Sequence, residues 1–471
     1  MLRINRFLKP AILNSLNHGE REGYIIQGRQ FTFTRDELPR LHPPGNDIDC
    51  RMDILGGRLR DRLNSESVDN REVLMGRARF GWPEKSVEVI YVVGVPLDDV
   101  AAAFHDAPIL VMQGYGNYVS PLSPCSSSSA TPTILPSSTP LEPPLPPTSV
   151  ALSENVPLSP PDMMYMLIEA RKALYGENTA SREHSARIQL LKRANGLRGA
   201  LIPPPIFPGQ SISGKHLFTM GSFCVHIAPQ PSTEDYPDNI CYGLTACHGV
   251  VPLPFDLSRI KRSVVCPSEL DKAALIYRNL PLIRQGSPAV SEALSWTGVI
   301  GEVSVATLGK DDNGNRADLA ILKLKKEYSS TNTNTTFENQ RDPVDKEIII
   351  KEGAGTGTTA GIIGTDGFSL SFQKRDVALP ESDSNPATVD VCYMSTVWCE
   401  GESFADSGDS GAPILAPGED GLHFVGMLLG VYHAESPTQD IGLFVSQSVV
   451  FEQLEQMTGT KWVIRKTGQD A

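Results

Sequence analysis

The sequence GDSGAP at residues 408–413 is the most informative stretch of the chain. It presents Ser410 between glycines, and a motif this specific is expected by chance on the order of once in several thousand chains of this length. A serine on a glycine-flanked turn is typical of an enzymatic nucleophile, but its hydroxyl attacks poorly without a neighbouring base. The remainder of the chain must therefore supply a base and a group that orients it.

His248 is the histidine best suited to act as that base. It lies in the run LTACHG at residues 244–249, where an apolar strand is expected to end and to leave the imidazole on a loop. Asp318 stands immediately before the apolar run of residues 319–324, so we expect its carboxylate at the mouth of a strand and buried with it. A buried carboxylate fixes the imidazole tautomer and would complete a set of nucleophile, base and orienting acid.

These three residues and their neighbours resemble the trypsin-like, chymotrypsin-fold serine peptidases. In that family the catalytic residues follow the chain order His, Asp, Ser, which His248, Asp318 and Ser410 share. The histidine motif of the family, TA-x-H, matches residues 245–248, and its aspartate followed by aliphatic residues matches residues 318–322. The conjunction of these motifs is more specific than any one of them.

A fourth similarity lies between the aspartate and the serine. The sequence KEG at residues 351–353, followed by TGTTAG at residues 356–361, looks like a strand pair in the second barrel of many such peptidases. The resemblance covers about residues 221–463. It implies a mainly β fold with a double six-stranded antiparallel β-barrel catalytic domain, which we expect over residues 211–465.

The resemblance also implies an activity, that of a serine endopeptidase acting on protein or peptide substrates with no cofactor and no metal ion. His248 would take the proton from Ser410 during attack on the scissile carbonyl, and Asp318 would orient the imidazole. The backbone N–H groups of Gly408 and Ser410 would hold the oxyanion. Activity should fall as the pH drops through the ordinary titration range of histidine, about 6 to 7.

Residues of a substrate pocket are implied by the same resemblance. The pocket floor lies six residues before the serine, at Phe404. The wall is a strand made of Leu429, Gly430 and Val431, and Gly442 lies opposite it. Because no acid stands at the floor position, cleavage after Arg or Lys is not expected, and a small or apolar side chain before the scissile bond is favoured. The nearby Asp406 leaves a basic preference open.

One departure from the family pattern concerns activation. Secreted members begin the mature domain with IVGG, whose freed amine pairs with the aspartate before the serine, but no such sequence precedes Phe223. We therefore expect Asp409 to pair with an internal residue or a helix, and activation by cleavage is not implied. A second departure is the long interval between His248 and Asp318, which leaves room for an insertion at about residues 251–296.

Two other functions are alternatives to the serine endopeptidase. An α/β-hydrolase requires Gly-x-Ser-x-Gly and a histidine after the serine. His423 and His433 do follow Ser410, but Ala412 replaces the second glycine and the β-rich texture disfavours that fold. The other alternative is a catalytically silent peptidase-fold module that binds peptides or scaffolds an assembly. Retention of all three catalytic residues favours the enzyme.

Short β-rich runs alternate with Gly, Pro and Asn clusters through the C-terminal half, which favours barrels or a sandwich. We predict strands at residues 223–227, 298–306, 319–324, 347–350, 361–363, 368–372, 389–394 and 424–431. Residues 448–457 have helical spacing and resemble the helix that ends the fold in this family.

A linker divides the chain. Of the 41 residues from 121 to 161, 26 are Pro, Ser or Thr, which predicts a disordered linker over residues 119–161. A ligand for an aromatic-lined recognition domain is the alternative interpretation of this tract. After the linker, residues 162–200 are predicted to form a helical segment.

Residues 1–118 are predicted to form a small N-terminal α+β module of unknown role, through which the chain would contact a protein partner. Strands are expected at residues 87–97 and 109–112, with a short helix at residues 98–106 between them.

Composition narrows the function further. The chain of 471 residues has 42 basic and 55 acidic residues, and its net charge of -13 argues against a nucleic acid or an acidic membrane as partner. No apolar run approaches the roughly 20 residues that cross a bilayer. Lys9 and Asn14 interrupt what would be the apolar stretch of a secretory signal, so we expect an intracellular, cytoplasmic protein.

The eight cysteines include no CxxC pair, so neither a zinc site nor a redox site is indicated. Cys247 stands beside His248 and is either a redox-sensitive thiol or a small buried hydrophobe. The second interpretation is favoured, because unpaired cysteines are among the most buried residues.

Overall fold

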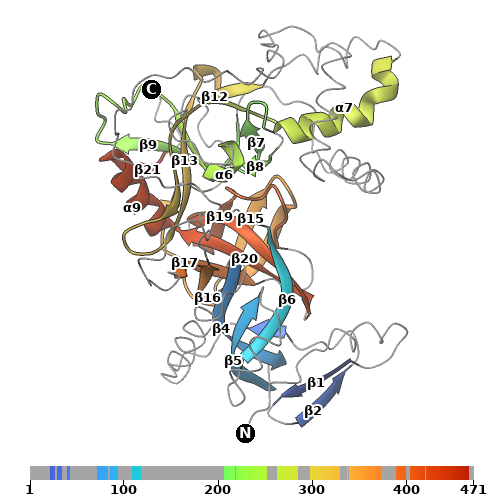
Figure 1. Ribbon diagram of the computed structural model, residues 1–471. Helices are drawn as coiled ribbons and strands as arrows, with labels where there is room; N and C mark the ends of the chain where they lie inside the picture. Colours follow the sequence, from blue (N-terminus) through green and yellow to red (C-terminus); the bar gives the residue numbers. More distant parts are fainter. Residues whose placement is uncertain are drawn as a thin grey trace, which may run out of the picture.

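Strands make up most of the residues that the computed structural model describes, as the alternation of β-branched and polar residues between Gly- and Pro-rich turns predicts (Figure 1). The structure describes residues 22–26, 29–33, 40–42, 72–82, 85–93, 109–117, 206–217, 219–251, 262–284, 298–328, 337, 339–372, 389–398, 404–419, 421–436 and 438–465.

The first barrel is built from the middle of the chain. Its strands are β7 (Ser211–Gly214), β8 (Gly221–Ser222), β9 (Val225–Gln230), β10 (Tyr242–Thr245), β11 (Ser263–Val265), β12 (Val299–Lys310) and β13 (Arg316–Leu324). They are antiparallel neighbours in the order β9, β10, β13, β12, β11, β7, β8. Only Phe223 and Cys224 separate β8 from β9, and their N–H groups donate to the carbonyls of Gln210 and Leu244. Because β8 and β9 form one bent strand, the sheet closes as a six-stranded barrel.

The second barrel follows in the sequence. Its strands are β15 (Ile348–Gly353), β16 (Gly357–Phe372), β17 (Val389–Trp398), β18 (Pro413–Gly418), β19 (Gly421–Ser436) and β20 (Thr438–Ser446). The order β18, β15, β16, β17, β20, β19 is antiparallel throughout, and β19 pairs with β18 to complete a ring. The predicted double six-stranded antiparallel β-barrel is confirmed. The short strand β14 (Asn339–Gln340) pairs in parallel with β19.

All eight predicted stretches lie at least partly in strands, with one difference in connectivity. Residues 361–363 and 368–372 belong to the single strand β16, because a register shift between Ile363 and Asp366 absorbs the intervening polar residues as an irregularity. Sequence analysis missed short strands such as β7, β11 and β18, since three to six residues carry little periodicity.

Two helices pack beside the first barrel. The predicted C-terminal helix is confirmed as α9 (Gln447–Thr458), which ends at Gly459 in the left-handed conformation. It is not the last element, because β21 (Lys461–Ile464) follows and pairs with β9 (Figure 1). Sequence analysis missed α7 (Glu269–Arg284), which lies within the predicted insertion; Leu270 and Ala273 of this helix are buried.

Six strands come from the N-terminal part of the chain, and four of them extend the second barrel. They are β1 (Glu22–Ile26), β2 (Arg29–Phe33), β3 (Arg40–His42), β4 (Glu72–Trp82), β5 (Lys85–Val93) and β6 (Ile109–Asn117). The last two confirm the two predicted strands. β4 pairs with β16 and β6 pairs with β19, so β3, β4, β5 and β6 join the sheet of the second barrel, whereas β1 and β2 form a separate two-stranded sheet (Figure 1). Tyr91 of β5 contacts Trp398 of β17 edge-to-face, with ring centroids 5.7 Å apart.

The predicted short helix at residues 98–106, the linker at residues 119–161 and the helical segment at residues 162–200 lie outside the described residues. Among the helices that the structure does describe, none is long and apolar enough to pass through a lipid bilayer.

Candidate active site

His248 lies in a single helical turn, α6 (Cys247–Val250), directly after β10. The prediction of a loop at this position is wrong, because the chain leaves β10 through the extended Ala246 and turns at once into the helix. The other three residues of the turn are buried, so they anchor it to the first barrel. The imidazole keeps a small exposed fraction of 9%.

Asp318 is buried in β13 and holds His248 at two points. Oδ1 accepts the backbone N–H of His248 at 3.1 Å, and Oδ2 lies 2.7 Å from the imidazole Nδ1. Because an ionised carboxylate only accepts hydrogen bonds, Nδ1 carries the proton and Nε2 is left as the basic nitrogen. The strand begins three residues before the predicted start, so Asp318 lies within it.

Arg316 approaches the same carboxylate and was missed by sequence analysis. Its side chain is fully buried, and Nη2 lies 3.5 Å from Oδ2 of Asp318. Burial alone would raise the pKa of Asp318, but His248 and Arg316 together hold that pKa below its ordinary value of 3.8. Asp318 is therefore ionised at neutral pH. The signal available in the sequence was a basic residue two positions before this aspartate, at the head of an apolar run.

Ser410 lies on the turn that precedes β18, between two glycines with positive φ. Gly408 has a φ of 99° and Gly411 a φ of 89°, which glycine adopts without steric cost. The N–H groups of Gly408 and Ser410 have no acceptor among the described residues, although both residues are buried. Buried N–H groups without a partner are rare in native structures. This pair can therefore bind an incoming oxyanion.

Ser222 of β8 connects this turn to the first barrel. Its N–H donates to the carbonyl of Ser410 at 2.7 Å, and its hydroxyl donates to the carbonyl of Gly408 at 2.9 Å. The carbonyl of Ser222 in turn accepts the hydroxyl of Thr245, at the end of β10, at 2.8 Å. The serine turn is thereby held against the strand that leads to His248.

Gly411 makes the closest approach between the serine turn and the first barrel. A Cβ at this position would lie 2.4 Å from the Ser222 carbonyl oxygen and 3.0 Å from the backbone nitrogen of Ala246. Only glycine fits there, and Ala246 is two residues before His248.

Within the described part of the chain no hydrogen bond joins the Ser410 hydroxyl to His248. Such bonds are often long in enzymes without substrate.

The residues predicted to form the substrate pocket are only partly brought together. Val431 and Gly442 are paired across β19 and β20, and a Cβ on Gly442 would lie 2.7 Å from the ring of Phe404. The Phe404 ring is fully buried and shares a core cluster with Val431. Leu429 packs in a different cluster, and Gly430 pairs with the residue after Gly442.

Four cysteine side chains are described, and all are free and buried: Cys224, Cys241, Cys247 and Cys266. Burial raises the pKa of the Cys247 thiol well above its ordinary range, and this side chain packs in the first barrel as a small hydrophobe. Within the described ranges, no cluster of His, Cys, Asp and Glu side chains is arranged to hold a metal ion.

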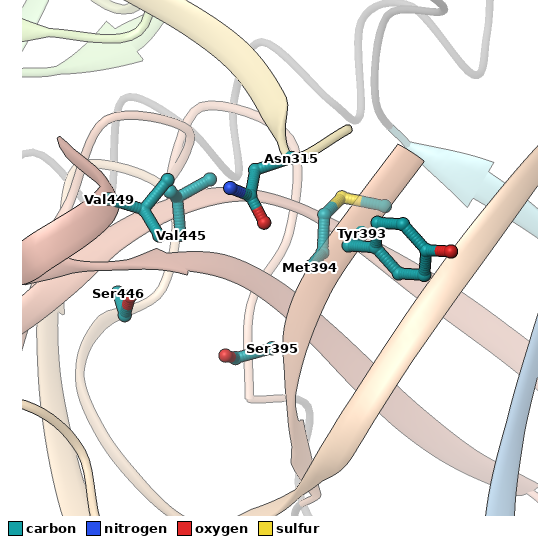
Figure 2. A pocket seen from close by; sticks show the side chains of 7 residues that line it. All are labelled: Asn315, Tyr393, Met394, Ser395, Val445, Ser446 and Val449. Atoms are coloured by element: carbon teal, nitrogen blue, oxygen red, sulfur yellow. The ribbon is translucent and has the colours of Figure 1, made fainter. Parts of the chain in front are cut away.

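A cavity of about 300 Å³ lies near the tip of the β12–β13 hairpin. Figure 2 shows its lining side chains, which come from this hairpin, β17, β20 and the start of α9: Asn315, Tyr393, Met394, Ser395, Val445, Ser446 and Val449. The backbone N–H of Tyr393 donates to the carbonyl of Gly314 at 2.9 Å and links the hairpin tip to the second barrel. The cavity contains none of the residues that sequence analysis assigned to catalysis.

Residues 393–464 match Peptidase family S64. The resemblance to a peptidase family is thereby confirmed. The matched segment of the chain includes Ser410 and its turn, as well as β18, β19, β20 and α9.

Solved structures similar to this chain include three that share little sequence with it. Protease A of Thermobifida fusca is 14% identical, with a TM-score of 0.31, and the Nocardiopsis protease NAPase is 13% identical, with a TM-score of 0.32. The chymotrypsin of Cellulomonas bogoriensis is 13% identical, with a TM-score of 0.29. Each match covers 56% of this chain and 100% of the other. No curated protein matches the sequence.

Proposed function

We propose that this peptidase is a serine endopeptidase with Ser410 as its nucleophile. His248 takes the hydroxyl proton through Nε2 as Oγ attacks the scissile carbonyl carbon, and Asp318 orients the ring and stabilises the imidazolium. The imidazolium then gives the proton to the leaving amine, the C–N bond breaks, and the acyl group remains on Ser410. A water molecule deprotonated by His248 hydrolyses this ester and restores the serine.

The observation that carries the proposal is the pair of N–H groups on Gly408 and Ser410 that find no acceptor among the described residues. The amides of Asp409 and Gly411, which alternate with them along the turn, donate to the carbonyls of Asp406 and Leu428. A turn built only for stability would gain nothing from two buried donors without acceptors. A tetrahedral oxyanion would supply the missing acceptor, and one such donor is worth about 10²–10³ in rate.

The imidazole supports the same proposal through its bonding. Asp318 holds both the backbone N–H and the ring Nδ1 of His248, so the ring is fixed in position and in tautomer. An ionised Asp318 would also stabilise the imidazolium that forms when Ser410 is deprotonated. The basic Nε2 that this tautomer leaves on His248 is the nitrogen that a general base needs.

The preference for a small or apolar residue before the scissile bond is retained in the proposal. The fully buried Phe404 ring lies against Gly442 and Gly361, so this part of the second barrel is apolar and already occupied. The ammonium of Lys351 lies 5.9 Å from the centroid of the same ring.

A catalytically silent binding module is the second candidate. The observation in its favour is that no hydrogen bond connects the Ser410 hydroxyl to His248 within the described residues. Such a module would bind peptides and leave them intact, whereas the enzyme would release two fragments.

A library of fluorogenic peptides blocked at both ends distinguishes the two candidates. We expect cleavage at internal bonds at neutral pH, and a loss of about 10⁶ in kcat for Ser410→Ala. Unfolding temperatures of both proteins control for folding. Peptides that bind but remain intact with wild-type protein would support the binding module and would contradict the proposed endopeptidase.

A further inference from the structure

Lys351 is a buried cation that the proposed reaction does not use directly. It lies in the middle of β15, where buried and exposed residues alternate, so that Ile349, Lys351 and Gly353 face the interior while Glu352 faces outward. The Lys351 ammonium has no exposed surface, and neither has the carboxylate of Asp409, 3.0 Å away. Lysine is almost never fully buried without a partner.

The ammonium uses all of its hydrogen-bonding capacity inside the barrel. Lys351 Nζ donates to the Thr356 hydroxyl at 2.6 Å, to the Gly357 carbonyl at 3.1 Å and to Asp409 Oδ2. Three N–H bonds thus meet three acceptors. The Thr356 hydroxyl in turn donates a hydrogen bond to Asp409 Oδ2 at 2.8 Å. Lys351 is therefore connected to the carboxylate both directly and through this hydroxyl.

The carboxylate of Asp409 is held from the other side by backbone amides. Oδ1 accepts the N–H groups of Gly355 and Thr356 at 2.7 and 3.1 Å, and Oδ2 accepts the N–H of Asp406 at 3.0 Å. Asp409 stands between Gly408 and Ser410, the two residues with unbonded N–H groups. Fixing its side chain therefore fixes the backbone that carries both oxyanion donors.

We propose that Lys351 is a positioning residue that keeps the oxyanion turn formed by supplying the cation for Asp409 from within this chain. The inference rests on the proposed endopeptidase function. A freed α-amine is then not needed to form the turn. Without the ammonium, Asp409 would be a buried, unpaired charge, which is strongly destabilising. The carboxylate would turn toward water and carry the N–H groups of Gly408 and Ser410 out of position.

A pH dependence follows from this arrangement. Burial lowers the pKa of Lys351 below its ordinary value of 10.5, and this effect is larger than that of the nearby charges of Asp409, the outward-facing Glu352 and Asp406, which favour the protonated form. The protonated lysine is the form that holds the turn. Activity should therefore be present below this lowered pKa and decrease reversibly as the pH rises through it.

Removal of both charges separates positioning from folding. Because a buried ion pair can often be replaced by neutral groups without loss of stability, we expect the double variant Lys351→Met/Asp409→Asn to fold. Its kcat should fall by about 10²–10³, the effect of losing an oxyanion donor, with little change in KM. Lys461→Met, at an exposed position of β21, is the matched control and should leave kcat unchanged.

The conservative variant Lys351→Arg gives a second readout. A guanidinium stays protonated above pH 12, so the decrease in activity at high pH should move upward while kcat at neutral pH stays within about tenfold of wild type. A double variant with wild-type kcat, or an Arg variant with an unshifted alkaline profile, would overturn the inference alone. A wild-type protein that neither cleaves peptides nor reacts with a fluorophosphonate would overturn the proposed function, and the inference with it.

Discussion

Each barrel buries one aspartate beside a nitrogen base, and the two pairs differ in their access to solvent. Asp318 in the first barrel faces His248, whose side chain keeps 9% exposure, whereas Asp409 in the second faces Lys351, which has none. An imidazole that reaches the surface can exchange a proton with a substrate, but an enclosed ammonium can only hold its partner. Under the proposed function, the first pair would support proton transfer and the second would hold the oxyanion turn in position.

The largest effect on kcat is expected when the carboxylate of the first pair, Asp318, loses its charge. Asp318→Asn keeps the shape of the side chain but favours the wrong tautomer of His248, and kcat should fall by about 10⁴ as in comparable triads. The matched variant Asp409→Asn should lose only about 10²–10³ by disturbing the oxyanion turn. Steady-state kinetics on one fluorogenic peptide measures both losses. Equal losses would mean that the two aspartates do not have separate roles.

A smaller effect concerns the contact between the two barrels at Gly411. Gly411→Ala places a Cβ 2.4 Å from the Ser222 carbonyl oxygen at a φ of 89°, so we expect a loss of about 3 kcal/mol in the free energy of unfolding. Gly459→Ala is the matched control, because its φ is also positive at 67° but no atom lies within 4 Å of the new Cβ. It should lose only about 1–2 kcal/mol. Denaturant titrations that give equal losses would refute the close approach at Gly411.

The smallest expected effect is the dependence of the free energy of unfolding on pH in the acid range. The pKa of Asp318 is lowered in the folded protein, so its ionised form contributes stability above the ordinary value of 3.8 and loses it as the pH falls through the folded-state pKa. The difference in unfolding free energy between wild type and Asp318→Asn should therefore shrink below about pH 4. A difference that stays constant down to pH 2 would show that Asp318 is not stabilised by His248 and Arg316.

The sequence predicted the fold well because the motif residues lie within or close to strands of the two barrels. The order His248, Asp318, Ser410 and the β-rich runs between them pointed to the double barrel, and α9 was recognised by its helical spacing. The helix α7 was not recognised, since the long interval after His248 suggested only an insertion. The continuity of β16 could not be predicted either, because a bulge near Asp366 carries polar residues through the strand.

Parts of the candidate site could not be predicted because they depend on which way strands face. The sequence suggested an internal partner for Asp409, but only the inward position of Lys351 in β15 identifies it. Ser222 is one of many serines and gains its place from pairing across β7 and β8. In the sequence, Arg316 is typical of an exposed charged residue beside a strand. Only the structure identifies its burial beside Asp318.

The most direct test of a nucleophile activated by the first barrel is covalent labelling. Wild-type protein would be incubated with a fluorophosphonate at pH 7.5, digested, and analysed by mass spectrometry, with Ser410→Ala and His248→Ala as controls. We predict a single phosphonylated residue, Ser410, and labelling that disappears in the first variant and slows at least about 10³-fold in the second. Unmodified Ser410 in wild-type protein, or labelling that persists at full rate without His248, would contradict the account.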